Sequence, residues 1–178
     1  ALEPRQAVEL LRMCLDAGYD RAQTLTAVNG MMLLAGQGER FTTVDLFLLD
    51  LWTGKASLDK LGAAGSYLMQ AEGLSLLGGD ALPLGILENV ESGEKLMQLH
   101  QGDTLILLSD GVEDAYENRQ AMEETIRDAL TLETAQDAAN AILTGAQSGD
   151  TAPADDQTVL VLRLIRARAD AKIEEMYQ

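Results

Sequence analysis

Histidine, cysteine, aromatic side chains and positive charge are all scarce in this 178-residue chain, and each shortage excludes a class of function. Cys14 is the one cysteine, so no internal disulfide can form, and the cytoplasm is the expected compartment. His100 is the one histidine, which excludes a histidine-rich zinc site. With 13 Lys and Arg against 29 Asp and Glu the net charge is −16, so we expect neither nucleic acid nor an anionic membrane surface as a partner. No apolar run reaches the roughly 18–20 residues that a membrane-spanning helix needs.

Hydrophobic residues make up 47% of the chain, which is enough for a buried core, and the length fits a single domain. Aromatic residues contribute only 4%, so the core must consist mainly of Leu, Ala, Val and Met. Residue 1 is not Met, and the chain opens almost directly into a helix. We therefore expect residues 1–178 to form a single domain that is N-terminally truncated relative to a longer protein.

The periodicity of the apolar residues predicts helices, then a run of hairpins, then more helices and a last strand. This order is typical of an α+β domain with antiparallel sheets. Apolar residues occur on both alternating faces of residues 44–49, so we expect this strand to be covered on both sides, with sheets packed face to face and helices outside. The expected helices are 4–17, 20–35, 119–130, 133–144 and 167–177, and the expected strands are 41–52, 56–61, 66–70, 74–77, 95–100, 104–109 and 158–165, with 95–100 and 104–109 forming a hairpin.

Two apolar runs carry carboxylates at one end. Residues 104–108 are followed by Ser109-Asp110-Gly111, and residues 158–162 are preceded by Asp155-Asp156. If the runs are neighbouring antiparallel strands, the end of the first and the start of the second share one edge of the sheet, which places Asp110 beside Asp155. Mg²⁺ and Mn²⁺ prefer oxygen ligands, so the pattern predicts a metal site. The alternatives are an ordinary Asp-Gly turn at Asp110, a solvated strand flank at Asp155-Asp156, or a Ca²⁺ or Mg²⁺ site with a purely structural role.

Other polar residues also need an explanation. Asp114 follows Glu113 in what should be the first turn of a short helix, from which Asp114 could contact metal-bound water. Asp45 lies in an apolar strand, where a buried carboxylate needs a partner or a site; a strand end satisfied by a neighbouring residue is the alternative. Ser66 and Ser109 have no histidine in a triad-like context, which excludes a serine hydrolase.

A family resemblance runs through six segments of the chain. They are VNGMMLL (28–34), FTTVDLFLLDLWTG (41–54), KLGAAGSYL (60–68), LPLGILENVE (82–91), GDTLILLSDGVEDA (102–115) and DDQTVLVLRL (155–164). In this order and spacing they resemble the metal-dependent protein phosphatases of the type 2C class, and among them the phosphatase domain of the stage II sporulation protein E family. Each segment alone is a weak signal, whereas six in order are specific.

The resemblance implies a four-layer α-β-β-α sandwich in which a bridged pair of Mn²⁺ or Mg²⁺ ions activates a water for attack on phosphoserine or phosphothreonine. It implies that Asp110 and Asp155 are the catalytic, metal-ligating residues, and that Gly111, Asp114 and Asp156 support them, Asp156 through a hydrogen bond. The implied substrate is a phosphorylated anti-sigma-factor antagonist of sporulation control. The first two helices would act as a regulatory switch coupled to homodimerisation. Close relatives carry membrane spans, so an anchored parent protein is compatible with the resemblance.

The sequence departs from the family at one point. The first metal motif, an Asp-Gly-Met-Gly-type segment before the first helix, is absent. Its aspartate bridges the two metals, so residues 1–178 supply half of a binuclear site, and we expect weak or no catalysis from this segment alone. The second hypothesis is therefore a non-catalytic interaction module of the same fold.

Overall fold

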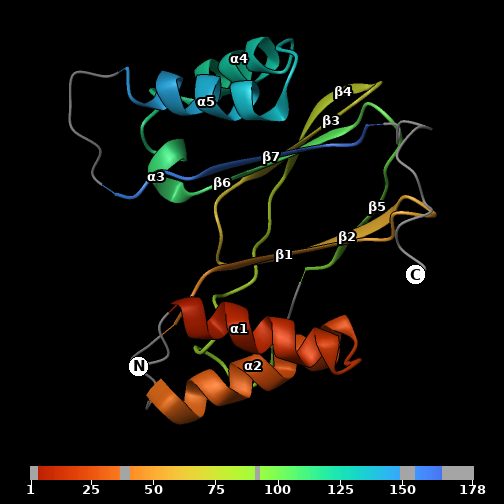
Figure 1. Ribbon diagram of the computed structural model, residues 1–178. Coiled ribbons are helices and arrows are strands. Elements are labelled where there is room, and N and C mark those ends of the chain that lie inside the picture. Colours follow the sequence, from red (N-terminus) through yellow and green to blue (C-terminus); the bar gives the residue numbers. More distant parts are fainter. Residues whose placement is uncertain (1–3, 37–40, 91–92, 149–154, 166–178) are drawn as a thin grey trace, which may run out of the picture. The chain divides into compact units, whose positions relative to one another are not determined.

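The computed structural model describes residues 4–36, 41–90, 93–148 and 155–165 (Figure 1). The chain divides into two compact units: unit 1 comprises Ala1–Gly65 and Leu77–Met97, and unit 2 comprises Ser66–Leu76 and Gln98–Gln178. None of the helices in the described ranges is long and apolar enough to cross a membrane. In chain order the elements are α1 (Pro4–Asp16), α2 (Arg21–Gly36), β1 (Val44–Leu49), β2 (Lys55–Leu61), β3 (Ser66–Gln70), β4 (Gly73–Leu77), β5 (Lys95–Gln98), β6 (Thr104–Leu108), α3 (Asp110–Glu113), α4 (Arg119–Ala129), α5 (Ala135–Ala146) and β7 (Val159–Arg163).

Unit 1 contains a three-stranded sheet in the order β1-β2-β5, with α1 and α2 on one of its faces (Figure 1). Leu25, Val28 and Met32 recur every three or four residues along α2 and are buried against Leu46 of β1 and Leu61 of β2. Leucines of α1 pack against the same cluster. Each large apolar side chain that is fully buried in this way contributes roughly 1.5–3 kcal/mol, so apolar contact holds the helical pair on the sheet.

Ion pairs fix charged side chains inside unit 1. Arg21, the first residue of α2, donates to the fully buried carboxylate of Asp59 on β2, and also to Glu94 at 3.0 Å. Lys60 is fully buried as well, and its Nζ donates to both carboxylate oxygens of Asp45 at 2.7 and 2.9 Å. The strand register places Asp45 directly opposite Lys60, so this cross-strand pair satisfies both charges. The carboxylate of Asp45 is therefore satisfied by a neighbouring residue, which was the alternative to a functional site at this position.

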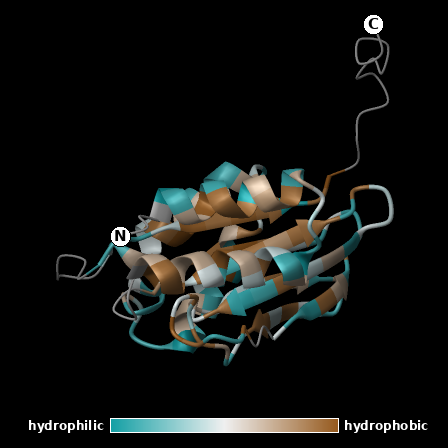
Figure 2. Cartoon of the chain, turned by 90° about the horizontal axis from the view of Figure 1, so that it is seen from below, coloured by the Kyte–Doolittle hydropathy of each residue, from teal (hydrophilic) through white to brown (hydrophobic). Residues whose placement is uncertain are grey.

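Unit 2 contains a four-stranded sheet in the order β4-β3-β6-β7, with α4 and α5 on one face (Figure 1). β6 lies between β3 and β7 and is antiparallel to both. The core of this unit joins Tyr67 and Ile106 of the sheet to Met122, Ile126 and Ile142 of the helices, all of which are buried. Figure 2 colours the chain by hydropathy and shows hydrophilic residues mixed with hydrophobic ones along the helices.

Side chains cap both long helices of unit 2. Oδ1 of Asn118 accepts the N–H of Ala121 at 3.0 Å at the start of α4. Oγ1 of Thr134 accepts the N–H of Asp137 at 3.0 Å at the start of α5, and the Thr134 hydroxyl donates to the Asp137 carboxylate at 2.7 Å. Each cap contributes about 1 kcal/mol, which helps to fix where the helices begin.

The predicted hairpin of residues 95–100 and 104–109 is wrong. β5 pairs within the sheet of unit 1, whereas β6 lies inside the sheet of unit 2. The intervening turn bonds to other strands: the N–H of Gly102 donates to the carbonyl of Leu164 at 2.8 Å, and the carboxylate of Asp103 accepts from Nε2 of Gln70 at 2.8 Å. The turn closes on itself, since the N–H of Asp103 donates to the carbonyl of His100 at 3.1 Å, but it is also bonded to Gln70 and Leu164, which are distant in the sequence.

The predicted strand of residues 41–52 is too long. The carboxylate of Asp50 accepts the N–H groups of Trp52 and Thr53 at 2.9 and 3.2 Å, which starts a turn just after β1. Within β1, Leu46 is the one buried residue and the others are half-buried, because β1 is an edge strand. The remaining predicted helices and strands agree closely with the structure, and the sheets with their helices confirm the α+β class; the helix predicted at 167–177 lies outside the described residues.

Candidate metal centre

The end of β6 and the start of β7 lie at the same edge of the sheet of unit 2. The register pairs Leu108 with Val159 at the last position of this ladder. One step further, the N–H of Ser109 donates to the carbonyl of Thr158 at 3.0 Å. The prediction that the two apolar runs are adjacent antiparallel strands is therefore confirmed.

Asp110 and Asp155 flank this edge, the first after β6 and the second before β7. Their chain segments approach each other at the buried Gly111, where an added Cβ would lie 2.6 Å from the carbonyl oxygen of Asp156 and 3.1 Å from that of Asp155. No side chain fits in this space. Glycine is therefore required here for close packing of two backbone segments.

Two side chains connect the same segments. The hydroxyl of Ser109 donates to the carbonyl of Asp156 at 3.0 Å and accepts the N–H of Thr158 at 2.9 Å. Nε2 of Gln157 donates to the carbonyl of Gly111 at 3.1 Å. The edge that carries the candidate carboxylates is thus cross-linked by side chains as well as by the backbone.

Each candidate carboxylate is oriented by the N–H of the residue that follows it. Oδ1 of Asp110 accepts from Gly111 at 3.0 Å, and Oδ1 of Asp155 accepts from Asp156 at 2.7 Å. Both side chains are exposed, and within the described part of the chain neither Oδ2 atom accepts a hydrogen bond. Carboxylate oxygens with free lone pairs are what hard divalent cations require, so the donor chemistry fits Mn²⁺ or Mg²⁺.

The neighbouring acidic residues do not extend this pair into a larger cluster. Asp114 ends the short helix α3, where its N–H donates to the carbonyl of Asp110 at 2.8 Å, and its side chain is exposed. Asp156 accepts the Ser109 hydroxyl through its backbone carbonyl, while its carboxylate is exposed. Among the residues that the structure describes, no group of three or more Asp, Glu, His or Cys side chains could hold a metal ion. Among the described residues, Asp110 and Asp155 therefore remain a pair of candidate ligands without a third acidic, histidine or cysteine side chain to complete a cluster.

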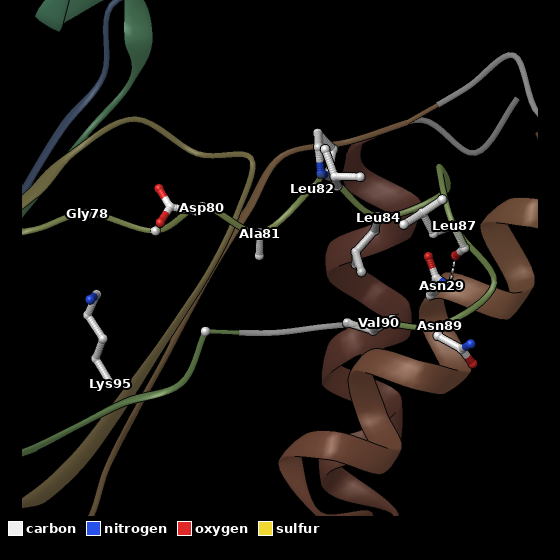
Figure 3. A pocket seen from close by; sticks show the side chains of 13 residues that line it. Asn29, Gly78, Asp80, Ala81, Leu82, Leu84, Leu87, Asn89, Val90 and Lys95 are labelled. Atoms are coloured by element: carbon white, nitrogen blue, oxygen red, sulfur yellow. Dashed lines mark hydrogen bonds between the residues drawn. The ribbon is translucent and has the colours of Figure 1, made fainter.

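A pocket of about 450 Å³ lies within unit 1 (Figure 3). Its wall includes the buried Asn29 of α2, whose Oδ1 accepts the N–H of Gly85 at 2.8 Å and whose Nδ2 donates to the carbonyl of Leu87 at 2.8 Å. Figure 3 shows Asp80 and Lys95 at the opposite end of the pocket from Asn29. Asn29 thus anchors the loop that lines the pocket, a role that sequence reasoning missed. The sequence feature that could have indicated this role is a polar residue among the apolar positions of α2.

Known proteins match the chain over most of its length. The family model described as Stage II sporulation protein E (SpoIIE) matches residues 1–165. Stage II sporulation protein E of Priestia megaterium is 28% identical over 110 residues, which are 62% of this chain and 19% of that protein. The structure of the PP2C phosphatase domain and a fragment of the regulatory domain of SpoIIE from Bacillus subtilis has a TM-score of 0.78 at 26% identity, covering 90% of this chain and 49% of that one. The catalytic domain of the serine/threonine protein phosphatase PstP in complex with 2 manganese ions has a TM-score of 0.71 at 20% identity, covering 91% of this chain and 82% of that one.

Proposed function

Because the chain belongs to the stage II sporulation protein E family and has the fold of the PP2C phosphatases, we propose that it acts as the phosphatase domain of a metal-dependent protein serine/threonine phosphatase. The observation that carries this proposal is the position of Asp110 and Asp155 at one hydrogen-bonded edge of a sheet. Two oriented carboxylates on a rigid support suit a catalytic metal site better than carboxylates on a mobile loop do.

Asp110 and Asp155 would hold a divalent cation, Mn²⁺ or Mg²⁺, through carboxylate oxygens that the protein leaves free. When bound, a pair of such ions lowers the pKa of a water and neutralises the phosphoryl oxygens during in-line displacement. The manganese ions in the PstP complex support a divalent cation for this fold. The nearby carboxylates of Asp114 and Asp156 add negative charge that favours a cation, and Gly111 lets the two ligand-bearing segments meet.

The proposed substrate is a phosphoserine or phosphothreonine on an anti-sigma-factor antagonist of sporulation control, which follows from the family and not from the geometry. The matched segment spans 19% of the curated relative, so the proposal concerns this domain. We also propose a cytoplasmic location and a homodimer formed through α1 and α2. The dimer is supported by apolar side chains that both helices expose, namely Val8 and Met13 on α1 and Met31 and Leu34 on α2.

The test uses the chain extended upstream of residue 1, because residues 1–178 alone are expected to show weak or no catalysis. It measures phosphate released from a phosphoserine protein, with and without Mn²⁺. Asp110→Asn keeps the size of the side chain and removes the charged ligand. Asp128→Asn removes an exposed carboxylate on α4 and serves as the matched control. We expect release that requires Mn²⁺, is lost in Asp110→Asn and persists in Asp128→Asn. Release that is independent of Mn²⁺, or equal in both variants, would refute the assignment.

The second candidate is a non-catalytic interaction module. It is favoured by the small donor set, since the described residues contain no acidic cluster larger than the pair. A module of this kind would bind the phosphoprotein without releasing phosphate, and the affinity measured by calorimetry would not respond to Mn²⁺ or to Asp110→Asn.

A further inference from the structure

We propose that Ser109 and Gln157 are positioning residues that clasp together the two segments carrying Asp110 and Asp155. The clasp would set the separation of these carboxylates before a cation arrives. This inference rests on the proposed function, because it assigns two further residues to the same site.

The N–H and the hydroxyl of Ser109 bond across this edge, whereas its carbonyl accepts the N–H groups of Val112 and Glu113 at 3.0 and 3.3 Å. Its N–H donates to the carbonyl of Thr158 at 3.0 Å, and its hydroxyl donates to the carbonyl of Asp156 at 3.0 Å and accepts the N–H of Thr158 at 2.9 Å. Ser109 immediately precedes Asp110, and Asp156 immediately follows Asp155. Each of these hydrogen bonds across the edge therefore joins the residue before Asp110 to the segment that follows Asp155. Without the hydroxyl, two backbone groups lose their partner and the start of β7 is free to shift.

Gln157 closes the clasp from the other segment, since its Nε2 donates to the carbonyl of Gly111 at 3.1 Å. Its own Oε1 is buried and accepts no hydrogen bond within the described part of the chain. A buried amide oxygen without a partner destabilises the fold, so this side chain adds little net stability. The Gln157 amide instead links Gly111, the residue after Asp110, to the segment that begins at Asp155.

The consequence concerns the affinity for a cation. Residues that orient metal ligands through hydrogen bonds typically change metal affinity by about 10–100-fold when they are substituted. We expect Ser109→Ala and Gln157→Leu each to weaken Mn²⁺ binding by about tenfold, the lower end of that range, because each removes one part of a shared clasp.

The test measures Mn²⁺ affinity by electron paramagnetic resonance of the free ion, together with the melting temperature of the metal-free chain. Ser75→Ala is the matched control, because the Ser75 hydroxyl donates to the carbonyl of Leu68 at 3.2 Å between β4 and β3 of the same sheet, with no link to the carboxylates. Ser109→Thr retains the hydroxyl and should restore affinity. Gln157→Leu should leave the melting temperature unchanged or raise it, which a purely stabilising role would not produce.

The outcomes separate the two proposals. Weaker Mn²⁺ binding in Ser109→Ala and Gln157→Leu, with normal binding in Ser75→Ala, supports the clasp. Normal binding in the two clasp variants, when Asp110→Asn abolishes binding, overturns the clasp and leaves the proposed function in place. A loss of affinity that Ser75→Ala shares also overturns it, because instability would then be the cause. If the unaltered chain shows no Mn²⁺ binding that depends on Asp110, both proposals fail.

Discussion

Replacing Gly111 by alanine tests the close approach on which the candidate metal centre depends. The φ angle of Gly111 lies outside the left-handed region, so alanine is compatible with the local backbone. The obstacle is space: the new Cβ would lie 2.6 Å from the carbonyl oxygen of Asp156 and 3.1 Å from that of Asp155. Both obstructing atoms belong to the backbone, so no side chain can rotate out of the way.

Two opposing effects decide how much Gly111→Ala changes the free energy of unfolding. Alanine in place of glycine within a helix is favoured by roughly 0.5–1 kcal/mol, because glycine loses more backbone entropy on folding. Overpacking a filled space costs typically about 1–3 kcal/mol. A contact of 2.6 Å is shorter than real Cβ atoms show, so the 155–156 segment must move and the overpacking cost prevails. We expect Gly111→Ala to lower the free energy of unfolding by about 1–2 kcal/mol and to weaken Mn²⁺ binding as the carboxylates separate.

Gly30→Ala is the matched control. Gly30 also lies within a helix, its φ is not left-handed, and an added Cβ would meet nothing within 4 Å. This variant should gain stability, by roughly 0.5–1 kcal/mol. Urea unfolding followed by circular dichroism gives both values, provided that the slopes against urea are equal. If Gly111→Ala is stabilised like Gly30→Ala and binds Mn²⁺ normally, the reasoning from close approach is wrong.

Four further predictions concern other sites. The hydroxyl of Tyr67 is buried and has no hydrogen-bond partner in the described part of the chain. Tyr67→Phe should therefore raise the free energy of unfolding by roughly 1 kcal/mol. A lower free energy of unfolding in this variant would show that the hydroxyl does have a partner. Burial also raises the pKa of Tyr67 above its ordinary value of 10.0. As the pH rises past that value the unfolded chain loses the proton first, so the free energy of unfolding falls. Tyr67→Phe should make the free energy of unfolding fall less steeply with pH in a series of unfolding curves. Lys60→Met removes the ammonium group that pairs with the mostly buried Asp45 carboxylate and should cost about 3–5 kcal/mol, whereas adding Asp45→Asn should recover part of the loss in a double-mutant cycle. Leu34 is 86% exposed, so Leu34→Glu should change stability by less than about 0.5 kcal/mol yet reduce self-association in sedimentation, and unchanged sedimentation of a self-associating chain would exclude the α1–α2 dimer.

Local patterns in the sequence predicted most helices and strands, because the apolar period of an element is visible within the element itself. These patterns failed where the hydrogen-bond partner of a residue lies far along the chain. The turn before β6 is bonded to Gln70 of β3 and to Leu164 beyond β7, so its own residues do not reveal that β5 and β6 belong to different sheets. The same limit hid the buried charges of β2. Nothing adjacent to Asp59 and Lys60 in the sequence indicates that Arg21 and Asp45 are their partners.

The candidate site shows how far a motif can be interpreted without a fold. In the sequence, Asp110-Gly111 has the composition of an ordinary turn, in which glycine supplies a left-handed backbone. In the structure, Gly111 has no such conformation, and it is required because the carbonyl groups of Asp155 and Asp156 occupy the space of a side chain. The glycine and the distant Asp-Asp pair are thus parts of one packing arrangement, joined by the bonds of Ser109. If the carboxylate pair holds a cation, as proposed, this coupling predicts that substitutions at the glycine and at the serine affect Mn²⁺ affinity in the same direction; two solvated strand flanks would give no such correlation.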